Sequence, residues 1–482
     1  MKHFLVVVTL LGWLLCPPFL QGEEYRTFTN SSGKTVEAKV QSVEGGQVSI
    51  VLKNGTPFTI AVSSLSPSDQ EYLRNWVSQP ASSLPTTGTS VEAINGVIGH
   101  SLFAGTTLWE SDPGEVAERI RWPRESKTEI SESYRAYPRE DYRFLGARPF
   151  SAALYGENGK VTSISIVFAN KGDSFRSAGS AEEHFIAGKP VPGGMEGVQV
   201  LMEHDSKTIS QSLTELLGEP ESQKFGEGES RVNAERWDWA GHSFLLSHVE
   251  GEYVSLSIQT TEAADDRGRT ARVPDSVIRE RARGFVERRE NGDVVVTNVP
   301  MVDQGPKGYC VPATAERVMR FLGIPADMYL LAMAGETQAG GGTSVDRLLS
   351  NIGSDIKRKG RSFEIETGEL KMRDIERSID DGIPIMWAMF STSEFNDTAT
   401  ARTEQRKTEP WGDYVETVIA AAEAPGLTPN SSRGHVVIII GYNKETNEIA
   451  FSDSWGERYL ERWITLPEAE QISQSRFYII DL

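Results

Sequence analysis

The stretch DQGPKGYCVPATAERVMRFLGI, residues 303–324, joins a loop containing Gly and Pro to a helical pattern. Pro312 lies in the expected first turn, apolar residues then recur at helical spacing, and Gly323 ends the pattern. Cys310 therefore lies at or just before a helix N-terminus, where unpaired amides and the positive end of the helix dipole favour a thiolate over a thiol. The pattern predicts a reactive cysteine, and the alternative is a small apolar side chain buried in the core.

A cysteine nucleophile needs a base, and His435 is the only histidine after residue 248. It stands near the start of GHVVIIIGYN, residues 434–443, whose apolar run predicts a central strand. The next predicted strand, EIAFSD, ends at Asp453. A carboxylate at that point can hold an imidazole in the useful tautomer and stabilise its cation. Three chemically matched residues at the ends of elements favour a catalytic triad over unrelated structural residues.

The order of glutamine, cysteine, histidine and aspartate resembles that of the papain-like cysteine peptidases, especially the branch that includes the bacteriocin leader-processing peptidases. The loop has that family's glutamine-to-cysteine spacing of six (310 − 304), and DSWG, residues 453–456, resembles its Asn/Asp-Ser-Trp-Gly element. The resemblance implies a papain-like α+β domain over residues 294–482. It also implies the following roles: Cys310 as nucleophile, His435 as general base and acid, Asp453 as the group that orients His435, Gln304 with the Cys310 amide as oxyanion hole, and Trp455 as a shield over the His435–Asp453 pair.

The chain departs from papain in lacking cysteine-rich flanks, and Asp453 stands where papain-type enzymes have asparagine. Tyr309 replaces a residue that is small in many relatives. The family resemblance implies a peptide or protein substrate, but these departures leave its identity open. Neither a cofactor nor a metal is expected. Between the predicted core strand at 382–390 and the histidine strand, residues 391–433 form a long connection. We interpret it as a flap or helical insert beside the cleft, and a disordered surface loop is the alternative.

Residues 1–22 have the pattern of a signal peptide, in which an apolar run follows Lys2 and ends at Pro17 and Pro18. The run is shorter than the ~20 residues of a membrane-spanning helix, so we expect cleavage and export to the periplasm, the cell surface or the medium. An uncleaved anchor is the alternative. The formal net charge is −19, from 49 basic and 68 acidic residues, which disfavours nucleic acid and anionic lipid as partners.

Residues 25–76 alternate apolar and polar residues as half-buried strands do, with hairpin signals at Gly45-Gly46 and Asn54-Gly55. The pattern resembles the SH3-like homology module of endocytic adaptor proteins. That resemblance implies a small β-barrel that binds a protein or cell-envelope ligand. The residues that follow, 77–93, are rich in Ser, Thr and Pro and predict a linker.

Residues 94–262 predict an α+β middle domain. The segment GKVTSISIV (159–167) is similar to GEYVSLSIQ (251–259), and AERIRWPRES (117–126) is similar to LTELLGEPES (213–222). These similarities raise the hypothesis of a tandem repeat, with each half a helix followed by an antiparallel hairpin, and chance is the alternative. The histidines of this region lack metal-ligand spacing, so no metal site is expected.

The chain is therefore predicted to be an α+β multidomain protein, with a charged helical connector at residues 263–293 before the papain-like domain. The function predicted first is an exported cysteine peptidase that uses a Cys-His-Asp triad. An acyl-transfer enzyme on the same triad and a catalytically inactive binding protein with a peptidase fold are the alternatives.

Overall fold

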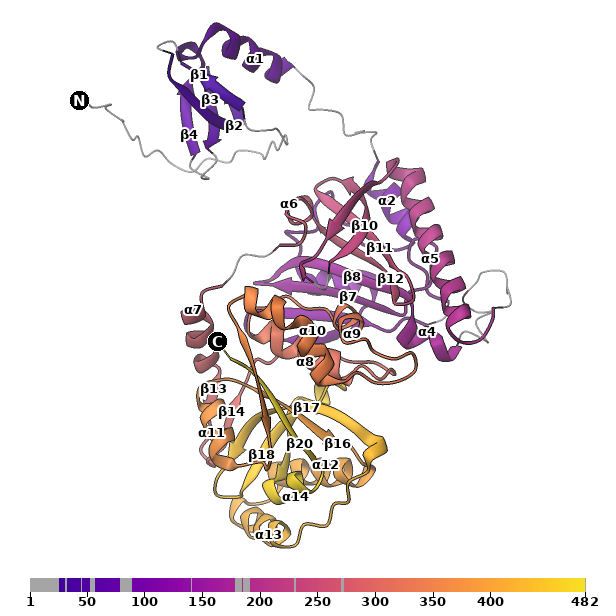
Figure 1. Cartoon of the computed structure of the whole chain (residues 1–482), viewed down its shortest axis with the longest axis vertical. Coiled ribbons are helices and arrows are strands. Elements are labelled where there is room, and N and C mark those ends of the chain that lie inside the picture. The colour runs from indigo at the N-terminus through magenta and orange to yellow at the C-terminus, as the bar shows by residue number, and fades with distance from the viewer. Residues whose placement is uncertain are drawn as a thin grey trace, which may run out of the picture. The chain divides into compact units, whose positions relative to one another are not determined.

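The computed structural model describes residues 26–481 except for 31–32, 45, 53–56, 79–88, 140, 178–183, 185–190, 229–230 and 270–272. The predicted signal peptide lies outside the described residues, as does most of the predicted linker. The chain divides into two compact units, Met1–Gly88 and Thr89–Leu482. The second unit contains both the predicted middle domain and the predicted papain-like domain (Figure 1). The prediction of a mixed α+β multidomain protein is confirmed, and the domain boundaries within the second unit stay predictions.

The N-terminal unit is one antiparallel sheet in the order β1-β2-β3-β4, followed by helix α1. Its elements are β1 (Arg26–Thr29), β2 (Thr35–Glu44), β3 (Gln47–Leu52), β4 (Pro57–Ala61) and α1 (Pro67–Ser78). The predicted closed barrel is wrong. Among the described residues β1 pairs only with β2 and β4 only with β3, and a single bridge joins Asn30 to Leu65. After β4 the chain continues as the short helix η1 (Val62–Ser64), and the described residues of this unit contain no fifth strand.

The middle part of the chain forms an eight-stranded antiparallel sheet in the order β5-β6-β7-β8-β12-β11-β10-β9. The first four strands follow helix α3 (Pro113–Ile120) and the last four follow helix α5 (Gly194–Leu217). In each half a helix is thus followed by four strands, whereas the sequence predicted a helix followed by a hairpin of two strands. Of the similar segments noted in the sequence, 159–167 and 251–259 lie side by side at the centre of the sheet, where Ile166 of β8 is opposite Leu256 of β12. The strands are β5 (Arg124–Lys127), β6 (Ser131–Ala136), β7 (Ser151–Glu157), β8 (Lys160–Asn170), β9 (Glu221–Phe225), β10 (Val232–Trp239), β11 (His242–Val249) and β12 (Tyr253–Thr260).

The two faces of this sheet have different neighbours. On one face Ile164, Ile166 and Phe168 of β8 pack in a core with buried residues of α5. The next residue along the strand, Val167, points to the other face and joins a second cluster with Tyr309 of the C-terminal part. The smaller helices of this region are α2 (Val91–Ile98), α4 (Lys171–Ser177) and α6 (Thr261–Asp265).

The C-terminal part is built on a second sheet, in the order β13-β14-β17-β16-β20-β15, with β18 paired to β17 and β19 paired to β18. Figure 1 shows helices α8, α9 and α10 between this sheet and the middle sheet. Helix α8 packs on β17 through a core that includes Val318 and Ile438. The elements are α7 (Asp275–Gly284), β13 (Val286–Arg288), β14 (Val294–Val296), α8 (Cys310–Phe321), α9 (Met328–Ala334), α10 (Val345–Arg358), β15 (Ser362–Thr367), α11 (Met372–Asp380), β16 (Ile385–Phe390), α12 (Ser393–Thr408), α13 (Trp411–Glu423), η4 (Ser431–Arg433), β17 (Gly434–Asn443), β18 (Glu448–Ser452), η5 (Glu457–Tyr459), β19 (Arg462–Thr465), α14 (Leu466–Gln471) and β20 (Ser473–Asp481).

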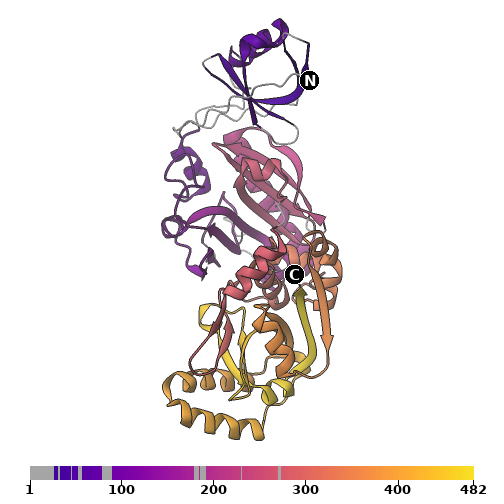
Figure 2. The same cartoon turned by 90° about the vertical axis from the view of Figure 1, so that its left-hand side faces the viewer.

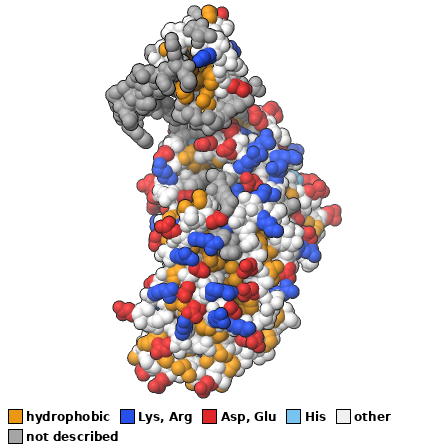
Figure 3. Space-filling model, turned by 60° about the vertical axis from the view of Figure 1, so that its left-hand side comes forward, with side chains coloured by type: hydrophobic (Ala, Val, Ile, Leu, Met, Phe, Trp, Pro, Cys, Tyr) orange, Lys and Arg blue, Asp and Glu red, His pale blue; other side chains and the backbone are white. Residues whose placement is uncertain are grey.

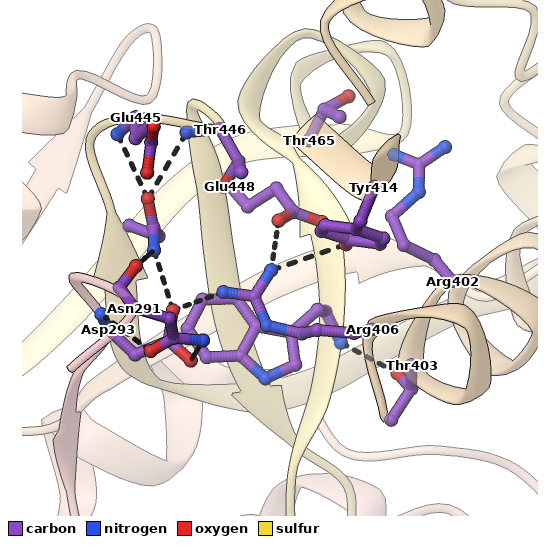
Figure 4. A network of polar contacts seen from close by, with 12 residues as sticks. Asn291, Asp293, Arg402, Thr403, Arg406, Tyr414, Glu445, Thr446, Glu448 and Thr465 are labelled. Atoms are coloured by element: carbon purple, nitrogen blue, oxygen red, sulfur yellow. Dashed lines mark hydrogen bonds and ion pairs between the residues drawn. The ribbon is translucent and has the colours of Figure 1, made fainter. Parts of the chain in front are cut away.

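Most of the long connection at residues 391–433 is helical. It holds α12 and α13, which lie beside the C-terminal sheet (Figure 2) and contact β19. Arg406 of α12 anchors this insert, because its guanidinium group pairs with the carboxylates of Asp293 and Glu448 (Figure 4). The same group lies over the Trp463 ring, 3.7 Å from the centroid. The insert is therefore held to the sheet by a buried polar network rather than by apolar packing alone.

Acidic and basic side chains are interspersed on the face of the molecule that Figure 3 shows. Within the described part of the chain, no helix is both long and apolar enough to cross a membrane.

Candidate active site

Cys310 is the first residue of α8, as the sequence predicted for a residue at a helix N-terminus. Its neighbour Tyr309 occupies the N-cap position and makes no side-chain capping bond. The first amides of a helix have no partner within the helix, so these N–H groups are available to a negative charge. The thiol is partly exposed, and no disulfide joins it to another described residue. Cys310 thus combines access with an electropositive position.

His435 is the second residue of β17, opposite Met389 of β16, and is almost fully buried. Its Nε2 atom lies 2.9 Å from Oδ1 of Asp453. Because that ring nitrogen is engaged, Nδ1 is the one left to face another group. The structure thus brings the predicted base and its predicted orienting carboxylate into direct contact.

Asp453 follows the end of β18 and is completely buried. Besides His435, its carboxylate accepts hydrogen bonds from the Ser454 amide at 2.9 Å and from the Arg462 guanidinium at 3.0 Å. Three donors that converge on one carboxylate stabilise its charged form and fix its orientation. Arg462 is a member of the site that sequence reasoning missed. From sequence alone, an arginine on a short strand is expected at the surface. Arg462 comes close to Asp453 because β19 pairs with β18, with Arg462 opposite Phe451.

The pKa of His435 is raised from its ordinary value of 6.5 to about 10. Burial by itself would lower this pKa, but the charge and hydrogen bond of Asp453 outweigh it. Hydrogen-bonding and Coulomb interactions with Cys310 raise it further, so the thiol lies within reach of the imidazole. The site therefore holds an imidazolium between a buried carboxylate and a sulfur at a helix N-terminus.

Trp455 covers one face of the His435 ring, in agreement with the role that the family resemblance implies. Its ring stacks on the His435 ring with centroids 4.8 Å apart and an interplanar angle of 27°. The indole in turn meets the Tyr459 ring edge-on at 5.5 Å. An aromatic cover of this kind excludes water from one face of the imidazole.

Gln304 is buried in the loop that precedes α8. Its backbone N–H donates to the Ser454 carbonyl at 2.9 Å, which ties the loop to the residue after Asp453. Its side-chain Nε2 donates to the Lys307 carbonyl at 3.2 Å. The described residues supply no hydrogen-bond partner for the buried Oε1.

Residues 296–479 match the Peptidase_C39 like family. The C-terminal part of the chain contains a C39-like peptidase domain. This confirms the sequence-based resemblance in its coarser form, over nearly the same residues as those predicted.

No curated protein matches the chain. Among the solved structures that match is the peptidase domain of Streptococcus ComA, which is described as a bi-functional ABC transporter involved in a quorum sensing pathway. The two share 10% sequence identity over 38% of this chain and 98% of that chain, with a TM-score of 0.25.

In the described part of the chain, one group of residues has the composition of a metal site. His184, His204 and Asp205 place their ligand atoms within 4.8 Å of one another, outside the C39-like domain. Both imidazoles interact with the same carboxylate oxygen of Asp205, at 2.7 Å from His184 and 3.3 Å from His204. Asp205 also accepts the Ala169 amide, so this carboxylate already has a structural role in joining α5 to β8.

Proposed function

We propose that the chain is a cysteine peptidase that hydrolyses peptide bonds with Cys310, His435 and Asp453. The observation that carries the proposal is the buried Asp453–His435 pair whose imidazolium interacts with Cys310 at the start of a helix. A thiolate beside an imidazolium at a helix N-terminus is the arrangement that activates cysteine as a nucleophile. The C39-like domain match supports the same reaction class.

In this mechanism the Cys310 sulfur attacks the substrate carbonyl carbon and a tetrahedral oxyanion forms. The Cys310 amide and the second Nε2 hydrogen of Gln304 stabilise that oxyanion. His435 then gives its proton to the leaving amine and a thioester remains on Cys310. Water attacks the thioester while His435 takes its proton as general base. The C–S bond breaks, the carboxylic acid is released, and the Cys310 thiolate and the His435 imidazolium are restored.

The N-terminal pattern of residues 1–22 supports the further proposal that the peptidase is exported. We also propose that the N-terminal sheet unit binds a protein or cell-envelope ligand. Its small size and its separate core, which includes Phe28, Val48 and Leu73, fit a binding module better than a catalytic one.

The proposal is tested by incubating the full chain with a peptide library, with and without an added primary amine, and identifying the products by mass spectrometry. Hydrolysis gives new carboxylate termini in both reactions. Acyl transfer, the second candidate, gives amine adducts that replace them. The absence of any product from the wild-type chain would favour the binding-protein alternative.

Replacing Gln304 with alanine should lower kcat by about 10²-fold and leave KM nearly unchanged, because its amide stabilises the oxyanion rather than the bound substrate. Steady-state kinetics on a peptide found in the library screen would measure both constants. A rise in KM at constant kcat would show that Gln304 binds substrate instead.

Peptide cleavage should be lost as the pH rises through about 10, because His435 must carry a proton for the leaving amine. Alkylation of Cys310 by iodoacetamide needs no such proton and should not fall over the same range. The raised pKa also means that the stability contributed by this pair is complete below pH 6.5 and lost between pH 6.5 and about 10. An alkaline limb of cleavage near pH 6.5 would contradict the assignment.

A further inference from the structure

The loop that carries Gln304, residues 303–309, is held from two sides. On one side are the contacts within the C39-like domain, which join Gln304 to Ser454 and to Lys307. On the other side are contacts with the middle sheet and α4, which no part of the proposed mechanism uses. We call residues 303–309 the Gln304 loop.

The residue before Gln304 is bound through its backbone by two side chains of the middle part of the chain, Glu125 of β5 and Tyr137, which directly follows β6. The Asp303 N–H donates to Oε1 of Glu125 at 2.8 Å, and the Asp303 carbonyl accepts from the Tyr137 hydroxyl. Glu125 belongs to β5 and is itself fixed by Nε of Arg135 at 2.6 Å. Two directed bonds, one to each peptide group of Asp303, set the position of the backbone immediately before Gln304.

The residue after Gln304 packs on the same tyrosine. Gly305 has φ +65°, in the left-handed region, and a Cβ atom at this position would lie 2.7 Å from the Tyr137 ring. Only glycine satisfies both conditions. The Tyr137 ring therefore limits how far the loop backbone can move on this side.

Lys307 contributes a buried cation to the same contact. Its side chain is 1% exposed, and Nζ lies 3.4 Å from Oδ1 of Asp173 on α4 and 4.6 Å from the centroid of the Tyr137 ring. Burial lowers the pKa of Lys307, and the Asp173 charge opposes that shift. A buried ammonium group without its partner is strongly unfavourable, so the loop conformation depends on Asp173.

Tyr309, the residue next to Cys310, completes the contact. Its ring lies in the cluster that includes Val167 and Tyr253 of the middle sheet. A Cβ atom on Gly172 would lie 2.5 Å from the Tyr309 hydroxyl, so this ring meets the backbone of α4 directly. Residues 303, 305, 307 and 309, at every second position of the loop, thus contact the middle part of the chain.

We propose that the middle domain is a positioning element of the catalytic site, which holds the Gln304 loop so that the Gln304 amide reaches the oxyanion. This inference rests on the proposed peptidase function and extends it to the role of the middle domain. Tyr137 is the main positioning residue, because it contacts residues 303, 305 and 307. A misplacement of about 1 Å in a catalytic group can lower a rate by about 10²-fold, so small changes at Tyr137 should be measurable.

Tyr137→Phe in the full chain tests the proposal, because it removes one hydroxyl and keeps the ring. We expect kcat to fall about tenfold or more at unchanged KM, and hydrogen–deuterium exchange of residues 303–309 to become faster. The rate at which iodoacetamide alkylates Cys310 should not change, since alkylation needs no oxyanion hole. The matched control is Tyr134→Phe on β6, which loses a hydroxyl that bonds to Glu132 at 2.8 Å and should leave all three measurements unchanged.

A double-mutant cycle separates positioning from general stability. If Tyr137 acts through Gln304, then Tyr137→Phe should cause little further loss of kcat in a Gln304→Ala background. If hydrogen–deuterium exchange of residues 303–309 is no faster in Tyr137→Phe than in Tyr134→Phe, the inference is overturned even without a turnover assay. Equal kcat in the two tyrosine variants, or additive losses in the cycle, overturns it as well. A wild-type chain that cleaves no peptide contradicts the proposed function instead, and the exchange measurement still decides the role of Tyr137.

Discussion

Cys310→Ala should reduce peptide cleavage by about 10⁴-fold or more, to the detection limit, while the protein keeps its fold. The loss is expected to be nearly complete because no other group in the site can form the thioester. The fold should survive because the thiol is partly exposed at the first turn of α8, and alanine is the residue that helices accept best. Turnover on a library-derived peptide and thermal unfolding of the same sample would measure the two effects.

The position of the Cys310 sulfur beside the His435 imidazolium also predicts a high rate of alkylation at low pH. In the wild-type chain iodoacetamide should label Cys310 rapidly near pH 6, where an ordinary thiol is nearly inert. His435→Ala should remove most of this reactivity, and Asp453→Asn should weaken it less. The double variant Cys310→Ala/His435→Ala should be no less active than Cys310→Ala alone, because the two residues act as one unit. Cleavage that persists in Cys310→Ala would show that the thiol is not the nucleophile.

Arg406→Ala should destabilise the protein by about 3–5 kcal/mol, the largest stability effect we expect from a single substitution. The Arg406 side chain is 6% exposed and pairs with two buried carboxylates, Asp293 and Glu448. Without the guanidinium group both carboxylates remain buried, and no cation between them offsets their repulsion of each other. The remaining partners compensate only in part. Asp293 keeps Asn443 Nδ2 at 2.7 Å, Asn291 Nδ2 at 3.0 Å and the more distant Arg289 at 3.9 Å, and Glu448 keeps the Tyr414 hydroxyl at 2.6 Å.

Denaturant unfolding of the two proteins would measure the difference. The matched control is Lys407→Ala at the next position of α12, where Lys407 pairs with Glu404 on the exposed surface. An exposed pair contributes little, so this change should alter the free energy of unfolding by about 0.5 kcal/mol or less. Equal stability of the two variants would mean that the Arg406 network does not hold the insert in place.

The sequence predicted the candidate site of the C-terminal domain better than it predicted the fold of the N-terminal unit. In the C-terminal domain the candidate residues Cys310, His435 and Asp453 each stand at the boundary of an element with a clear periodic signal, and the structure brings them together. In the N-terminal unit the alternating pattern predicted strands correctly, but the closed barrel was wrong. Alternation indicates which residues face the core, whereas closure depends on hydrogen bonds between the first and last strands. Among the described residues β1 and β4 do not pair, and a single bridge joins Asn30, after β1, to Leu65, after η1.

The sequence by itself determined the helix that begins at Cys310, the strand that carries His435 and the mixed α+β class, because these depend on residues that are near neighbours along the chain. Only the tertiary structure decided which distant groups complete the site, position its loop and anchor the insert. Arg462 reaches Asp453 through the pairing of two strands, Tyr137 reaches the Asp303 carbonyl across 166 residues, and Arg406 reaches Asp293 across 113. The physical reason is that a buried charge or a backbone carbonyl takes whichever partner the packing brings within about 3 Å, and no local pattern records that partner.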